Sequence, residues 1–134
     1  MIFDYKIENR KSSVESRKSN VVLIKKIMWE EKLKIYDALI AKCDRFKRKG
    51  KTMPYTSANG YMFSLLNKDG EIGIRFSKAV QEKYMKALNT TYYKSYGATM
   101  KGYILIPEVM LDDLDALAKY LDESYDYVMT LKPK

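Results

Sequence analysis

The sequence contains no histidine, and Cys43 is its only cysteine. Catalytic triads built on histidine, zinc sites with histidine ligands and intrachain disulfides are therefore excluded. Long apolar runs are lacking too: Val21 to Ile24 ends at Lys25, far short of the roughly 18 apolar residues that cross a membrane. No signal-peptide pattern follows Met1. We therefore expect a cytoplasmic protein with no membrane segment.

Length and composition are those of one globular domain, with 134 residues, 46% of them hydrophobic and 31% charged. The net charge is +8, and it is unevenly spread, with +7 over residues 28–100 and −3 over residues 101–134. Such a basic face attracts either nucleic acid or an acidic protein. The possible nucleic-acid contacts form one segment: Lys42, Arg45, Lys47, Arg48, Lys49 and Lys51.

Residues 1–27 are predicted to form a flexible basic leader, or to precede a translation start at Met28, because Ile7 to Asn20 has almost no apolar side chains. From Met28 to about Lys47, apolar residues recur every three or four positions, which predicts an amphipathic helix. Cys43 lies on this stripe, so we expect a small buried hydrophobe rather than a reactive thiol. The basic end of the helix, before Gly50, is also explained by the helix dipole.

A β-hairpin is predicted at Asp69-Gly70, a dipeptide that favours a two-residue type I′ turn. In that register Leu65 faces Ile74. One face of the hairpin then belongs to the core, with Tyr61, Phe63, Leu65, Ile72, Ile74 and Phe76, and the other carries Met62, Ser64, Leu66, Gly73 and Arg75. The preceding segment, Met53 to Gly60, is predicted to be a turn-rich connection into the sheet.

Two further elements follow the hairpin. Ser77 is predicted to cap a helix from Lys78 to about Leu88. Tyr92 to Ile106 supplies one or two strands, with Gly97 and Gly102 at turns or bulges. With a last helix after Pro107, this order predicts an α+β domain over residues 28–134. Its curved antiparallel sheet has a central β-hairpin, and three main helices pack against the sheet.

Candidate chemical motifs are few. Asp112, Asp113 and Asp115 could be taken for metal ligands, but carboxylates at the first turn of a helix cap its amides and oppose its dipole, and either Asp112 or Asp113 suits the N-cap. No glycine-rich phosphate loop is present, so we expect neither a metal nor a cofactor. Of the twelve tyrosines, only one cluster suits an exposed base-stacking platform: Tyr92, Tyr93 and Tyr96 with Lys94.

Short motifs stand in a fixed order from residue 28 onward. They are Lys51-Thr52-Met53-Pro54-Tyr55-Thr56-Ser57, Asn59-Gly60, Met62-Phe63-Ser64, Gly73-Ile74-Arg75, Gly97, Met100-Lys101, Tyr103 to Pro107, Ser124-Tyr125-Asp126-Tyr127 and Leu131-Lys132-Pro133. In this order and spacing the chain resembles the N-terminal domain family of the TfoX/Sxy competence regulators, particularly its single-domain bacterial members.

This resemblance implies helices packed on a curved antiparallel sheet and no known catalytic residues. The better-studied relatives look like transcriptional co-regulators of DNA uptake that work with the cyclic-AMP receptor protein and carry a second, C-terminal domain. This chain ends at Lys134, after the last predicted helix, so we expect no such second domain. The domain also looks similar to proteins proposed to bind DNA through a double-wing arrangement.

We therefore predict a binding or regulatory module that acts by protein contacts, with nucleic-acid binding through the basic segment as the alternative. Catalysis is the third and least favoured hypothesis, because the sequence shows no identifiable pair of a base and a nucleophile. The predicted contact face consists of Met53, Pro54, Tyr55, Thr56, Ser57, Asn59, Ser64 and Arg75. Arg75 beside hydroxyl donors would hold an anion or carboxylate. The alternative for Pro54 to Gly60 is a tight connection with no binding role.

Overall fold

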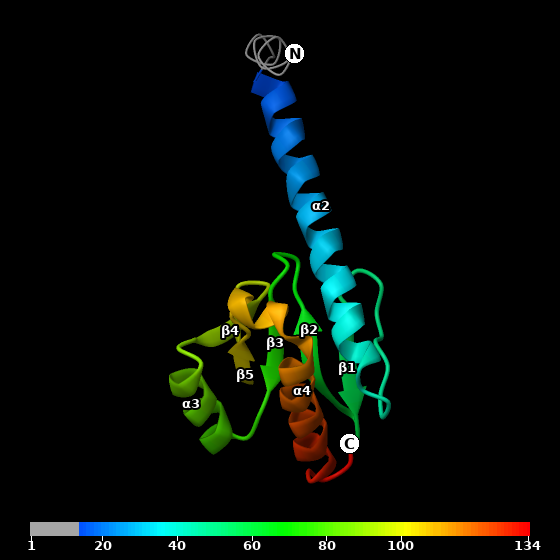
Figure 1. The fold of residues 1–134 in the computed structure, drawn as a ribbon, viewed down its shortest axis with the longest axis vertical. Coiled ribbons are helices and arrows are strands. Elements are labelled where there is room, and N and C mark those ends of the chain that lie inside the picture. Colours follow the sequence, from blue (N-terminus) through cyan, green and yellow to red (C-terminus); the bar gives the residue numbers. More distant parts are fainter. Residues whose placement is uncertain (1–13) are drawn as a thin grey trace.

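The computed structural model of this chain describes residues 14–134, and its fold class is the predicted one, α+β (Figure 1). Five antiparallel strands form one open sheet in the order β1-β2-β3-β5-β4. The strands are β1 (Tyr55–Ala58), β2 (Tyr61–Leu66), β3 (Ile72–Arg75), β4 (Tyr92–Ser95) and β5 (Ala98–Leu105). The helices are α2 (Val14–Ala41), α3 (Lys78–Ala87) and α4 (Leu114–Met129), with a short 3-10 helix η1 at Glu108–Asp112.

The main core lies between the sheet and the helices, with α4 crossing the sheet in Figure 1. The strands contribute Phe63, Leu66, Ile72, Ile74 and Ile104, and the helices contribute Tyr36, Leu39, Leu117, Leu121 and Val128, all buried. Each such apolar side chain stabilises the fold by about 1.5–3 kcal/mol relative to exposure. Phe63 also packs edge-on against the Phe46 ring, with ring centroids 5.0 Å apart, so the loop after α2 belongs to this core.

The other face of the sheet is closed by its own side chains. A second cluster there contains Leu65, Tyr93 and Tyr103, and no residue of the described helices belongs to it. The Tyr93 hydroxyl donates to the carbonyl oxygens of Leu65 at 3.1 Å and Glu71 at 2.8 Å, and Tyr103 donates to Met62 at 2.8 Å. Both rings thus reach over the sheet from β4 and β5 to backbone carbonyls of β2 and of the loop after it, and both are buried without a residue of the described helices in their cluster.

The predicted hairpin register is wrong by one residue. Leu65 pairs with Gly73, and Ser64 pairs with Ile74. Asn67 is the reason: its backbone amide bonds to the Glu71 carbonyl, and its side-chain oxygen accepts from the amides of Asp69 and Glu71. The loop therefore holds three residues, with only Gly70 of the Asp69-Gly70 pair at positive φ, instead of a type I′ turn. This slip moves Ser64 and Leu66 to the helix side and Leu65 to the opposite face.

Helix α2 differs from its predicted bounds at both ends. It begins at Val14 instead of Met28, so residues 14–27 of the predicted leader are helical, while residues 1–13 lie outside the described range. Helix propagation adds one hydrogen bond per residue once the packed part has formed, so a polar segment can extend it. At the other end α2 stops at Ala41, well before Lys47, and Gly50 is not its C′ residue.

Other local predictions from the sequence agree better with the structure. Ser77 accepts from the Val80 amide and Asp113 from the Ala116 amide, which confirms both predicted N-caps. The predicted connection from Met53 to Gly60 instead contains β1, which the Asn59-Gly60 turn joins to β2. The outer edge of β1 is bridged by Lys49, whose amide and carbonyl pair with the carbonyl and amide of Tyr55 at 2.7 and 2.9 Å.

Within the described residues, no helix combines the length and the apolar character that crossing a membrane requires.

Candidate functional site

Two hydroxyl residues of the predicted contact face, Thr56 and Ser64, point into the core. Thr56 and Ser64 are completely buried, and their side-chain oxygens lie 2.5 Å apart. The Tyr36 hydroxyl of α2 lies 2.6 Å from the Ser64 oxygen, so three hydroxyls satisfy one another. Burial raises the pKa of Tyr36 well above its usual value, despite the opposing hydrogen bonds of Ser64 and Thr56. This cluster links α2 to β1 and β2 and is closed to solvent.

The other predicted residues of β1 and its turn also have structural contacts. Ser57 accepts from the Lys49 ammonium at 2.9 Å. Asn59 donates to the carbonyl oxygens of Val128, in the last turn of α4, and of Leu131, just after that helix. Tyr55 packs against the second cluster with Met53. Pro54 is buried, and its carbonyl accepts from Leu66. The tight-connection alternative therefore accounts for these positions.

Arg75 is separated from the hydroxyls with which it was grouped. Ser64 pairs with Ile74, and side chains alternate along a strand, so Arg75 and Ser64 leave the sheet on opposite faces. The guanidinium carbon of Arg75 lies 5.5 Å from the Tyr61 ring centroid and 5.8 Å from that of Tyr127. Aromatic rings attract a cation without neutralising it. Arg75 is therefore held in place by rings at the end of β3.

No carboxylate neutralises Arg75 among the described residues. Of the three arginines with described side chains, Arg45 and Arg48 form ion pairs with aspartates, and Arg75 forms none. Its Nε atom is buried and has no hydrogen-bond partner in the described chain. An unmet guanidinium donor in a partly buried position carries a desolvation cost that an incoming acceptor would offset.

A cleft of about 530 Å³ opens beside Arg75, and we call it the Arg75 cleft. The lining is rich in aromatic and cationic side chains. It comes from the end of β3, the first turns of α3, the strands β4 and β5, and helix α4. The lining residues are Arg75, Phe76, Lys78, Gln81, Glu82, Tyr92, Thr99, Met100, Lys101, Gly102 and Tyr127. Gln81 is anchored by donating to the Tyr103 carbonyl at 2.9 Å. Three cations against one carboxylate favour an anionic ligand with an apolar body.

Gly102 lines this cleft at a position that favours glycine. Its φ is 86°, and a Cβ there would lie 3.1 Å from the Phe76 carbonyl oxygen and 3.3 Å from Cγ of Arg75. Neither Thr56 nor Ser57 lines the Arg75 cleft. Of the predicted contact residues, Arg75 is the one that lines this cleft.

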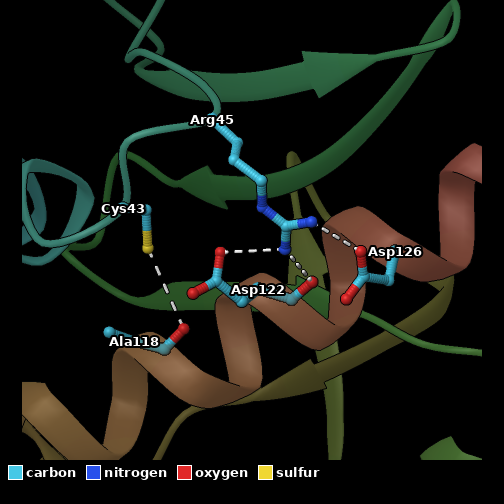
Figure 2. Close-up of polar contacts among 5 residues, drawn as sticks. All are labelled: Cys43, Arg45, Ala118, Asp122 and Asp126. Atoms are coloured by element: carbon cyan, nitrogen blue, oxygen red, sulfur yellow. Dashed lines mark hydrogen bonds and ion pairs between the residues drawn. The ribbon is translucent and has the colours of Figure 1, made fainter.

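Three of the six cations in the predicted nucleic-acid segment, Lys42, Arg45 and Arg48, pair with acidic side chains. Arg45 lies between two aspartates of α4, donating to Asp126 at 2.7 Å and Asp122 at 3.1 Å (Figure 2). These hydrogen bonds, that of Asp126 first, raise the pKa of Arg45 above its ordinary value. Lys42 pairs with Asp115 at 2.7 Å.

Arg48 donates to both carboxylate oxygens of Asp37, at 2.9 and 3.3 Å. Among the six predicted phosphate contacts, only Lys47 and Lys51 are exposed and form neither an ion pair nor a side-chain hydrogen bond within the described chain. The paired cations thus hold the loop after α2 onto its neighbours, while Lys47, Lys49 and Lys51 have no carboxylate partner among the described residues.

Two other sequence candidates have structural roles. Cys43 is 6% exposed, and its sulfur lies 3.9 Å from the Ala118 carbonyl oxygen (Figure 2). Burial, with the nearby Asp122 carboxylate, raises the pKa of its thiol to about 11. The predicted buried position of Cys43 is confirmed. The predicted exposed base-stacking platform is wrong for one of its three tyrosines. Tyr93 is fully buried, whereas Tyr92 and Tyr96 are exposed.

Compared with known proteins, the chain matches no protein-family model, no curated protein and no solved structure.

Sequence reasoning missed most of the residues that line the Arg75 cleft. Lys78 was visible only as the first residue of a helix, and Tyr127 only as part of a short motif. The single available signal was Gly102 inside a strand, which indicates a bulge or a close approach of another group. The cleft brings together residues between 75 and 127, and that proximity depends on the order β3-β5-β4, which local patterns do not contain.

Proposed function

We propose that this protein is a non-enzymatic binding and regulatory module that takes an acidic side chain of a protein partner into the Arg75 cleft. The observation that carries the proposal is the Arg75 guanidinium, which is fixed by two tyrosine rings and unpaired within the described residues. Guanidinium offers two parallel donors to a carboxylate, and such charge-assisted pairs are the stronger hydrogen bonds of proteins.

The resemblance to the TfoX/Sxy N-terminal family supports the same kind of role. It implies contact with a protein of the transcription machinery in the cytoplasm, with no catalytic step. The cleft suits this role because its lysines, Lys78 and Lys101, lie beside the aromatic surface of Tyr92 and Tyr127. A partner segment with a glutamate or aspartate next to an apolar residue has matching chemistry.

Nucleic-acid binding through the basic segment receives less support. Lys42, Arg45 and Arg48 already have carboxylate partners, and breaking those pairs would subtract from any gain on phosphate. The alternative predicts DNA affinity that falls steeply with salt, with a log-log slope of about −0.9 per phosphate contact. Non-specific DNA binding usually has dissociation constants below ~100 μM. If the protein at ~100 μM does not bind mixed-sequence DNA at low salt, the nucleic-acid alternative is excluded.

The proposal is tested by titrating the protein with a fluorescein-labelled hexaglutamate peptide and, as the neutral control, hexaglutamine. Arg75→Ala should weaken hexaglutamate binding at least ~tenfold, the equivalent of the ~1.5 kcal/mol lost with a charged hydrogen bond. Lys47→Ala is the matched control, because it removes one positive charge from an exposed position outside the cleft.

Arg75→Ala should also leave the free energy of unfolding within about 0.5 kcal/mol of the parent, as for a surface change. Arg75→Lys keeps the charge without the planar fork and should bind with intermediate affinity. Equal loss of binding in the Arg75 and Lys47 variants would show that only the net charge matters, and it would overturn the proposal. A parent protein that does not bind hexaglutamate would overturn it as well.

A further inference from the structure

The Arg75 cleft carries more positive charge than one carboxylate ligand balances. Its lining contains three cations, Arg75, Lys78 and Lys101, and one carboxylate, Glu82, which leaves an excess of two positive charges. None of the three cations forms an ion pair with a described residue. A phosphate monoester carries about −1.5 to −2 at pH 7 and offers three strong acceptor oxygens. The charge of the cleft therefore matches a phosphate ester more closely than a carboxylate.

Helix α3 begins at the wall of this cleft. Lys78 is its first residue and lines the cleft. The Ser77 side chain accepts from the Val80 amide, and the Gln81 amide makes a helical hydrogen bond to the Ser77 carbonyl. The amides that precede Val80 have no partner inside the helix, and the positive end of the helix dipole favours an anion beside them. The start of α3 thus acts in the same direction as the three cations.

An exposed aromatic ring stands beside these charges. Tyr92 lines the cleft, is 52% exposed and belongs to neither core cluster of the described residues. Tyr127, in contrast, already lies against the Arg75 guanidinium. The cleft volume of about 530 Å³ is that of a small-molecule site, with room for a ring as well as an anion. Tyr92 is therefore the ring that a ligand with an aromatic body would contact.

We propose that the acidic side chain bound by the Arg75 cleft is a phosphotyrosine of the partner protein. Its phosphate faces Arg75, Lys78 and Lys101, and its ring packs against Tyr92. This inference rests on the proposed function, because it names the side chain that enters the same cleft. Phosphoserine lacks the ring, and glutamate lacks both the ring and the second charge. Binding then depends on the phosphorylation state of the partner.

Four fluorescein-labelled pentapeptides test the ligand class. They have two glycines on each side of a central phosphotyrosine, phosphoserine, glutamate or tyrosine. The phosphotyrosine peptide should bind at least ~tenfold more tightly than the glutamate peptide, as expected for one further charged hydrogen bond. The phosphoserine peptide should lie between these two, and the tyrosine peptide should bind least. A phosphotyrosine peptide that binds no more tightly than the glutamate peptide would overturn the inference.

Substitutions in the lining test the two parts of the ligand separately. Tyr92→Ala should weaken binding of the phosphotyrosine peptide at least ~threefold and leave the phosphoserine peptide unchanged. Tyr96→Ala is the matched control, because Tyr96 is also exposed but lies outside the cleft. Lys101→Ala should weaken both phosphopeptides at least ~tenfold, whereas Lys47→Ala, at an exposed position outside the cleft, should not. Circular dichroism of each variant checks that the chain is folded.

The outcomes separate this inference from the proposed function. Hexaglutamate binding that depends on Arg75, without a preference for phosphotyrosine, keeps the proposed function and overturns the inference. Phosphopeptide binding that Arg75→Ala leaves unchanged would overturn the inference, because the anion then binds outside the cleft. Equal losses in the Tyr92 and Tyr96 variants, or equal affinity for phosphotyrosine and phosphoserine, would overturn the assignment to tyrosine.

Discussion

Asn59, in the turn between β1 and β2, donates its side-chain amide to the carbonyl oxygen of Val128, 2.9 Å away near the end of α4. The same nitrogen lies 2.8 Å from the Leu131 carbonyl oxygen. The final carbonyl groups of a helix have no partner inside the helix. One side chain from the sheet therefore closes the end of α4 and ties together two segments 69 residues apart.

Replacement of Asn59 should destabilise the fold through two separable effects. Asn59→Ala removes both hydrogen bonds and leaves alanine at a φ of 57°, so we expect a loss of about 2–3 kcal/mol. Asn59→Gly tolerates the positive φ and loses only the side chain, so the loss should be about 1–2 kcal/mol. Urea unfolding measures both. A glycine variant as stable as the parent would show that the two hydrogen bonds contribute nothing.

Gly73 leaves room for the Tyr93 ring. A Cβ at position 73 would overlap atoms of that ring, so Gly73→Ala should displace it and cost about 1–3 kcal/mol, as overpacking does. The same substitution in a Tyr93→Ala background should cost less than ~0.5 kcal/mol, because the obstacle is gone. Chemical denaturation of the four proteins tests this coupling, and additive losses would contradict it.

Stability should fall at alkaline pH, with Cys43 as one cause. Its pKa in the folded chain, raised by burial, is about 11, against an ordinary value of 9.0. A raised folded-state pKa gives a contribution that is complete below about pH 9 and is lost as pH rises toward 11. Tyr84, raised to about 12 by its hydrogen bond to Glu123, acts with the same sign above pH 10.

Thermal unfolding between pH 8 and pH 11 measures this loss for the parent and for Cys43→Ala. The variant should be less stable at pH 8, because a buried side chain is truncated, but its melting temperature should fall less steeply with pH. An identical slope in both proteins would exclude the thiol as a cause.

Removal of residues 1–27 should leave the domain folded. Val21, Leu23, Ile24 and Ile27 are half exposed, so a chain that starts at Met28 should unfold within about 0.5 kcal/mol of the parent. Scanning calorimetry of the parent and of the truncated chain measures the difference. A loss of several degrees would place this segment in the core.

Local signals predicted the caps and the fold class, because they depend on neighbouring residues alone. Ser77 and Asp113 bond to amides three residues away, within reach of a sequence pattern. The Asn59-Gly60 turn was equally visible, as Asn-Gly favours a hairpin, but the whole segment from Met53 to Gly60 was predicted to be a connection. The register of β2 and β3 could not be predicted from the Asp69-Gly70 pair alone, because the side chain of Asn67 selects a three-residue loop.

The candidate site was less predictable than the fold. Sequence reasoning singled out Arg75, which lines a cleft in the structure, but grouped it with Ser64, which lies on the other side of the sheet. The ion pairs of Arg45 with Asp122 and Asp126 cross 77 and 81 residues of sequence. No pattern within either segment indicates which cations are neutralised, and that distinction decides which basic residues remain available.

The bridge between Lys49 and Tyr55 bears on how the protein avoids aggregation. An edge strand offers unpaired amides and carbonyls to any extended chain, which is a common route to sheet extension between molecules. At the outer edge of β1, the first of these groups already bond to the backbone of Lys49. The opposite edge, β4, has only four residues and carries the exposed Lys94. Both edges of the sheet thus resist strand exchange with a neighbouring molecule.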